Sequence, residues 1–179
     1  MSVLVVAEHV RGELRPVTLE LSTAAKGLGE PVEVAVIARD PSAFTDAVNV
    51  EGVDEILAVR VDAEEFENDV YQNAVEQLVA ERSPEIVLLG FTVSAMGYGP
   101  ALAAKLGSGF ASDVLAVRRE DDGLVAERSF YGAKVNAEVD FPGHDRVILL
   151  LRPAAWPPAE GSGSAGVTEA FTTEQAKAI

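Results

Sequence analysis

One stretch, residues 84–113, constrains the fold more than any other part of the chain. It begins with a short apolar run, Glu85 to Leu89, whose composition is typical of a strand buried on both faces. Gly90 ends the run, and a loop with threonine and serine follows. Pro100 then opens an alanine-rich helix, which Gly107 ends. Because open α/β sheets bind ligands where a strand leads through a loop into a helix, we expect any small-molecule site here.

The chain before this stretch repeats the alternation of strand and helix. Continuous apolar runs predict buried strands, and apolar residues at helical spacing predict the helices between them. Such units should place their strands parallel, with right-handed connections. The expected strands cover residues 2–7, 32–38 and 53–61, and the expected helices cover residues 17–28, 43–48 and 62–82.

After Asp113 the apolar residues alternate instead of following a helical period. A hairpin turn signal at 121–123 and alternation over 124–130 and 134–141 predict an antiparallel meander. Residues 147–151 form a last, fully apolar strand. The sequence therefore predicts an α/β, Rossmann-like three-layer sandwich whose sheet is mostly parallel and carries an antiparallel C-terminal meander.

Residues 153–179 have a different composition. Prolines and a Gly-Ser repeat are typical of a linker, so we expect one domain over 1–152 and a linker or tail over 153–179. From Thr168 onward we expect weak helicity at best. Trp156 is a large apolar residue in this segment, and it either folds back on the domain or docks on a partner.

Composition excludes several classes of function. The 179 residues carry a formal net charge of −15, which argues against nucleic acid and anionic membranes as partners. No apolar run is long enough to insert into a bilayer. The chain lacks cysteine and shows no secretion signal. We therefore expect a cytoplasmic protein.

The sequence indicates neither a catalytic residue nor a metal site. Ser94 does not lie in a G-x-S-x-G motif and has no evident base nearby in sequence. The two histidines, His9 and His144, lie far apart and no cysteine accompanies them. We interpret both as ordinary surface or loop residues.

The loop after the central strand supplies the candidate binding residues, which are Gly90, Thr92, Ser94 and Gly97. Their spacing fits neither the dinucleotide fingerprint nor a P-loop. In one interpretation the glycines only form turns. In the other, backbone N–H groups at the helix start bind an anion or a nucleotide.

Several motifs together resemble the N-terminal domain of the α subunit of electron-transfer flavoproteins. The match covers about residues 1–155 and preserves the order and spacing of the family's motifs. It rests on Val3–His9, Arg15–Glu20, the central stretch, Arg128–Lys134 and Val147–Pro153.

The resemblance implies a fold like that of the adenine nucleotide alpha hydrolases and a heterodimer with a β subunit. The family carries electrons from dehydrogenases, such as the acyl-CoA dehydrogenases of fatty acid β-oxidation, to a downstream acceptor. FAD lies mainly in a C-terminal domain of the α subunit, which is absent from this chain. The resemblance thus implies a scaffold domain in an electron carrier, not an enzyme, with no stoichiometric FAD of its own.

Two other functions stay open at this point. A stand-alone, regulatory adenine-nucleotide-binding module would have a similar fold. A small α/β hydrolase or transferase is disfavoured by the missing nucleophile and base.

Overall fold

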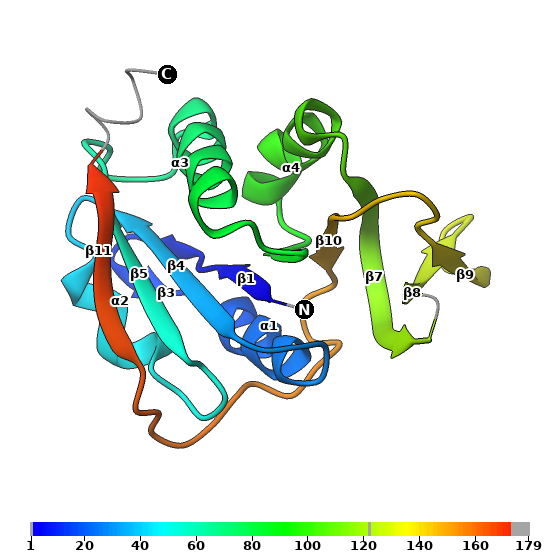
Figure 1. Ribbon diagram of the computed structural model, residues 1–179, viewed down its shortest axis with the longest axis horizontal. Coiled ribbons are helices and arrows are strands. Elements are labelled where there is room, and N and C mark those ends of the chain that lie inside the picture. The colour runs from blue at the N-terminus through cyan, green and yellow to red at the C-terminus, as the bar shows by residue number, and fades with distance from the viewer. Residues whose placement is uncertain (1, 122, 173–179) are drawn as a thin grey trace.

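The computed structural model describes residues 2–121 and 123–172 as three layers, a central sheet with helices on both faces (Figure 1). The strands are β1 (Val3–Val6), β2 (His9–Val10), β3 (Glu13–Leu14), β4 (Val32–Ala38), β5 (Glu55–Arg60), β6 (Ile86–Gly90), β7 (Gly109–Glu120), β8 (Gly123–Phe130), β9 (Val135–Asp140), β10 (Val147–Leu151) and β11 (Gly166–Thr172). The helices are α1 (Val17–Lys26), α2 (Ser42–Val48), α3 (Asn68–Arg82) and α4 (Val93–Leu106).

The central sheet has the strand order β11-β5-β4-β1-β6-β10-β7-β8-β9. From β11 to β7 neighbouring strands are parallel, and β8 and β9 continue the sheet in antiparallel fashion. The first part of β7 pairs with β10 and the second part pairs with β8, so this long strand joins the two regions. The predicted α/β fold with a mostly parallel sheet and an antiparallel meander is confirmed.

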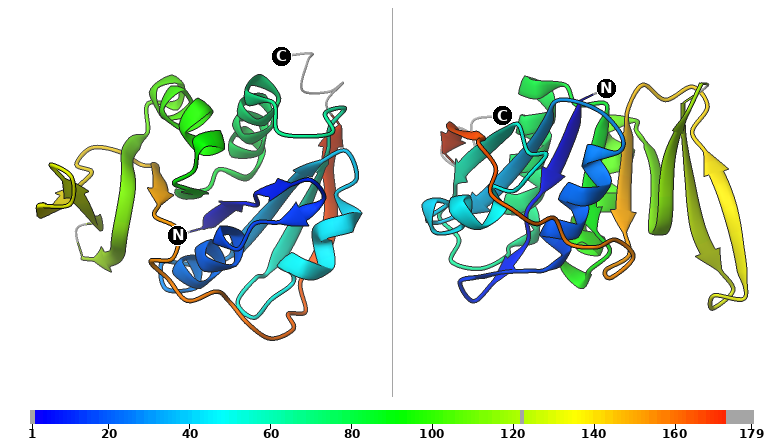
Figure 2. Two further views of the ribbon diagram at one scale, coloured as in Figure 1. Left: turned by 180° about the vertical axis from the view of Figure 1, so that it is seen from behind. Right: turned by 90° about the horizontal axis from the view of Figure 1, so that it is seen from below.

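Two apolar cores lie on opposite faces of the sheet. Every residue of β1, β4, β6 and β10 is buried, because helices cover both faces of these strands. Alternation along a strand divides its side chains between the cores, so Leu88 packs on the side of α1 and α2 and Leu89 on the side of α3 and α4. Figures 1 and 2 show these two helix pairs on either side of the sheet.

Helix α4 begins earlier than the sequence indicated. Its first residue is Val93, and the hydroxyl of Thr92 accepts the N–H of Ala95 at 3.2 Å as an N-terminal cap. Pro100 lies inside this helix, so the expectation that it opens the helix is wrong. Gly107 ends the helix at φ +61°, as predicted.

Gly97 and Gly99 both lie within α4 and not in a turn. A Cβ on Gly99 would lie 3.1 Å from Leu150 and 3.3 Å from Leu89, so the missing side chain lets the helix approach the sheet closely. The neighbouring helix α3 also differs from the expectation, since it begins at Asn68 and not near residue 62.

The segment after residue 152 has a place in the sheet that the sequence did not indicate. Residues 166–172 form β11, which pairs in parallel with β5 at the outer edge. Phe171 is buried in the core beside α3. The expected weak helicity from Thr168 is therefore wrong for 168–172, and a division at residue 152 would separate β11 from its own sheet. Residues 173–179 lie outside the described part of the chain.

The connection from β10 to β11, which we call the strap (residues 152–165), runs across α1 (Figure 2). The backbone N–H of Ala154 donates to the carboxylate of Glu20 at 2.6 Å, and the N–H of Ala159 donates to the carbonyl of Leu19 at 3.0 Å. Trp156 is partly buried against the core on this face. Of the two alternatives for Trp156, the structure therefore shows the one in which it folds back.

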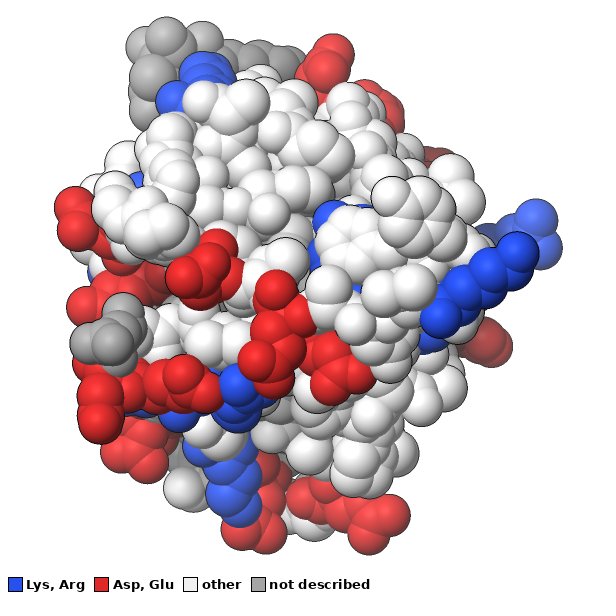
Figure 3. Space-filling model, turned by 90° about the vertical axis from the view of Figure 1, so that its right-hand side faces the viewer, with Lys and Arg blue, Asp and Glu red and all other residues white. Residues whose placement is uncertain are grey.

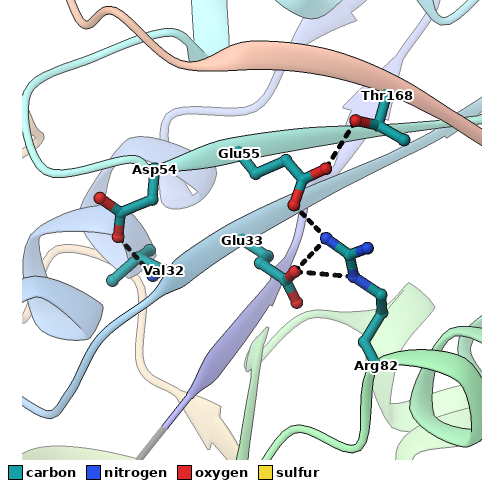
Figure 4. A network of polar contacts seen from close by, with 6 residues as sticks. All are labelled: Val32, Glu33, Asp54, Glu55, Arg82 and Thr168. Atoms are coloured by element: carbon teal, nitrogen blue, oxygen red, sulfur yellow. Dashed lines mark hydrogen bonds and ion pairs between the residues drawn. The ribbon is translucent and has the colours of Figure 1, made fainter.

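A charged network ties β11 and its neighbours to the end of α3 (Figure 4). Arg82, in the last turn of α3, forms ion pairs with Glu33 of β4 and Glu55 of β5. Glu55 also accepts the hydroxyl of Thr168 at 2.6 Å. A cation at this end of the helix interacts favourably with the helix dipole, so the network joins three strands and a helix at one end of the sheet.

Candidate functional site

The loops after β1 and β6 meet at one edge of the sheet, which we call the carboxyl edge because the parallel strands end there. Glu8 follows β1 and Thr92 follows β6, and the two strands are neighbours. The hydroxyl of Thr92 donates to the carboxylate of Glu8 at 2.7 Å. The backbone N–H of Glu8 in turn donates to the hydroxyl of Thr18 at 2.9 Å.

The start of α4 already has an anionic neighbour within the chain. Helix N-termini attract anions because their first N–H groups are unpaired and the dipole is positive there. In this protein the Thr92 hydroxyl caps the Ala95 N–H and also contacts the Glu8 carboxylate. A phosphate brought to this helix start would therefore meet a negative charge.

The cavity at the carboxyl edge is small. It is lined by Glu8, Gly90 and Ser94 together with aromatic side chains of the loop before α3 and of the two helices. Its volume is about 10 Å³, which is about the room that one water molecule needs. Two of the four candidate residues, Gly90 and Ser94, thus line a common cavity that has no room for a nucleotide.

The other two candidates have roles in packing and capping. Thr92 caps α4, as described above. A Cβ on Gly97 would lie 2.6 Å from the side-chain oxygen of Asn68, the first residue of α3. The glycine therefore permits α4 to lie close to the start of α3.

Two buried tyrosines, Tyr71 and Tyr98, line this cavity. Tyr71 donates its hydroxyl to the carbonyl of Ile37 at 2.8 Å. Burial raises the pKa of Tyr71 well above its ordinary value, and the carboxylates of Glu8 and Glu65 raise it further. Burial likewise raises the pKa of Tyr98. Burial therefore favours the neutral hydroxyl of both side chains over the phenolate.

His9 is buried, and its interpretation as an ordinary surface or loop residue is wrong. Its exposed fraction is 6%, and its ring stacks on Phe44 with centroids 4.4 Å apart. Its Nε2 atom lies 2.9 Å from the carbonyl of Ile37 and 3.1 Å from the hydroxyl of Tyr71. The small β2–β3 hairpin thereby anchors itself to the end of β4.

His144 is exposed, as expected, and lies far from His9 in the chain. Its Nδ1–H donates to the carbonyl of Gly107 at 3.0 Å. Within residues 2–121 and 123–172, no three His, Cys, Asp or Glu side chains gather in a way that could hold a metal ion. None of the described helices is both long and apolar enough to cross a bilayer.

Sequence reasoning did not single out Glu8 and Tyr71 as members of this site. Glu8 could have been found, because it directly follows a buried strand next to the one that ends at Gly90. Tyr71 lies on the apolar face of a helix, where its position in sequence gives no sign that it reaches the end of β4.

Comparison with known proteins identifies relatives over nearly the whole chain. Residues 3–175 match the electron transfer flavoprotein domain. The electron transfer flavoprotein subunit alpha of Methylophilus methylotrophus is 48% identical over 166 residues, which cover 90% of this chain and 52% of that protein. The protein of the same name from Mycobacterium leprae is 34% identical and covers 89% of this chain and 50% of its own length.

A more distant relative has a different name. A lactate dehydrogenase (NAD(+),ferredoxin) subunit of Acetobacterium woodii is 25% identical over 76% of this chain and 34% of its own length. The chain thus spans about half the length of these two α subunits and a third of this larger protein.

Proposed function

Because the chain belongs to the electron transfer flavoprotein family, we propose that it is the N-terminal scaffold domain of an α subunit. In this role it pairs with a β subunit in the cytoplasm and helps to form the surface on which a flavin domain moves. The assembled carrier takes electrons from dehydrogenases, such as acyl-CoA dehydrogenases, and passes them to a downstream acceptor. FAD lies mainly in the C-terminal domain of the α subunit.

The carboxyl edge carries this proposal, since it lacks what a nucleotide-binding module would need there. Its cavity has room for about one water molecule. Glu8 contacts the cap of α4 and places a carboxylate where a phosphate would bind. A nucleotide site would need a larger cavity and a helix start without a neighbouring carboxylate. A scaffold domain needs neither.

Co-expression tests the proposal. The chain is produced with a tagged electron transfer flavoprotein β subunit from Methylophilus methylotrophus and, as a separate polypeptide, the remaining half of the α subunit from that organism. We expect the β subunit to retain the chain through size-exclusion chromatography. We also expect FAD to be retained when all three polypeptides are present and to be absent from the chain alone.

Two results would contradict the proposal. A yellow protein with stoichiometric FAD in the chain alone would mean that the flavin site lies in this domain. Saturable binding of ATP or AMP to the chain alone, with no retention by the β subunit, would favour the stand-alone nucleotide-binding module.

A further inference from the structure

A second cavity, far from the carboxyl edge, contains polar groups that have no hydrogen-bond partner among the described residues. It measures about 400 Å³ and lies between the end of α4, the strands β7 and β8, and the turn after β9. Arg128 of β8 and Ser108, which follows α4, both line it. The Nε atom of Arg128 and the hydroxyl of Ser108 are both buried, and neither has a hydrogen-bond partner in the described part of the chain.

Such groups are unusual, because a buried donor without a partner costs about 1–3 kcal/mol of stability. Arg128 also lacks an ion pair with any described residue, although the net charge of the chain is −15. On the adjacent strand, by contrast, Arg118 pairs with Glu120 and Glu138. Arg128 therefore differs from Arg118 on the neighbouring strand in having no acidic partner among the described residues.

The guanidinium of Arg128 is held in place before any ligand arrives. Its carbon lies 4.6 Å from the ring centroid of Phe130, in a cation–π contact that favours this position of the group. A planar guanidinium offers parallel N–H donors that match the two oxygens of a carboxylate. The Ser108 hydroxyl adds one more donor on the wall of the same cavity.

From these observations we propose that this cavity binds a monocarboxylate with a short apolar chain, held by Arg128 and Ser108. Phe110, Val139 and Phe141 line the cavity and suit the hydrocarbon part of such a ligand. The carboxylate is either a free organic acid or a glutamate side chain that another protein presents.

The surrounding charges favour one negative charge over two. Asp140 lies on the exposed rim of the cavity. The neighbouring hollow on the other side of the turn is lined by Glu85, Glu120 and Asp145. Figure 3 shows acidic side chains gathered across the middle of the face of the molecule that carries the β8–β9 hairpin. These charges repel phosphate more strongly than a monocarboxylate.

Nuclear magnetic resonance of the whole chain tests the site. Butyrate represents the free acid and N-acetylglutamate methylamide represents a protein side chain. We expect saturable shifts of the Arg128 Nε–H signal and of the Ser108 and Gly109 amide signals, and weaker binding of phosphate. Tighter binding of butyrate would identify a free acid as the ligand. Tighter binding of N-acetylglutamate methylamide would identify a glutamate side chain of another protein as the ligand.

Variants assign the shifts to the named residues. Arg128→Gln should weaken binding at least about tenfold, and Ser108→Ala about two- to tenfold. Arg128→Lys keeps the positive charge but loses the parallel N–H donors of the guanidinium. This variant replaces Arg128→Gln in the test if the glutamine variant does not fold. Arg118→Gln is the matched control and should bind like the wild type. Sodium chloride at equal ionic strength controls for screening.

The proposal is overturned by either of two results. One is the absence of a saturable shift, beyond that of chloride, with both carboxylates. The other is an unchanged affinity in Arg128→Gln and Arg128→Lys, as read from the Ser108 and Gly109 amides.

Discussion

Asn49 holds the backbone of Ala165 with both ends of its side-chain amide. Its Nδ2 donates to the carbonyl of Ala165 at 3.3 Å, and its Oδ1 accepts the N–H of the same residue at 3.2 Å. The carbonyl of Asn49 also accepts the N–H of Gly163 at 2.9 Å. The end of α2 thereby fixes the strap directly before β11 begins, and this pairing joins residues 116 positions apart.

Replacing Asn49 with alanine should loosen the strap. The two backbone groups of Ala165 lose their partners, and we expect the free energy of unfolding to fall by about 1–3 kcal/mol. Urea unfolding measures this change. Asn73→Ala is the control, because Asn73 is exposed on α3 and its replacement should change stability little. Equal stabilities of the two variants would show that the pairing does not hold the strap.

Phe171→Ala tests whether β11 is part of the domain. Phe171 is 7% exposed, so its removal leaves a cavity and should cost about 3–5 kcal/mol. Val167 lies on the same strand and is 53% exposed, so Val167→Ala should cost less than about 0.5 kcal/mol. Thermal unfolding of both variants gives the comparison. A Phe171→Ala variant with the same melting temperature as the wild type would mean that β11 is not docked in solution.

The sequence predicts the central strands because their residues are apolar without interruption. Leu88 and Leu89 face opposite cores, so both must be apolar, and this pattern is visible locally. The last strand gives no such signal. Among residues 166–171 of this edge strand, only Phe171 is buried, and the place of β11 depends on pairing with β5, more than a hundred residues earlier. A local pattern cannot reveal a pairing over that separation.

Leu88→Asp should prevent folding. The side chain of Leu88 is fully buried, and an unpaired carboxylate there would cost several kcal/mol against a total stability of about 5–15 kcal/mol. Val93→Asp introduces the same charge at a residue that is 94% exposed and should fold normally. Circular dichroism distinguishes the two. A folded Leu88→Asp protein would contradict the assignment of β6 to the centre of the sheet.

Thr92→Ala should destabilise the start of α4. The variant loses the cap on the Ala95 N–H and the donor to Glu8, and we expect a cost of about 0.5–2 kcal/mol in denaturant unfolding. Thr92→Ser keeps the hydroxyl and should restore most of this stability. If serine and alanine are equally destabilising, the lost methyl group and not the cap is responsible.

High pH should unfold the protein through its buried tyrosines. The pKa values of Tyr71 and Tyr98 are raised in the folded state, so above about pH 10 the unfolded chain loses protons that the folded chain keeps. The free energy of unfolding therefore does not depend on the ionisation of these two tyrosines below about pH 10, and it falls as the pH rises beyond this value. Urea midpoints between pH 8 and 11 measure this decline.

The double variant Tyr71→Phe/Tyr98→Phe removes both titrating groups. We expect its stability to decline less steeply with pH, even though Tyr71→Phe also loses the hydrogen bond to Ile37. An identical slope in the double variant would mean that other groups cause the alkaline unfolding.

The sequence predicts a loop after β6, but it does not indicate the contacts that the residues of this loop make within the chain. Gly90 marks the end of β6 as expected. The start of α4 was misplaced because Pro100 gave a stronger local signal than the cap at Thr92. The contact between Thr92 and Glu8 depends on the pairing of two strands, which residue types alone do not specify.

The order of synthesis has a consequence for the pairing of β5 with β11. The strand β5 lies two-thirds of the chain earlier, and β11 is its outer neighbour in the completed sheet. While a ribosome is still making the second half of the chain, β5 has an open edge, which can pair with strands of other nascent chains. β11 closes that edge, so translation must reach Thr172 before this edge of the sheet is protected from such association.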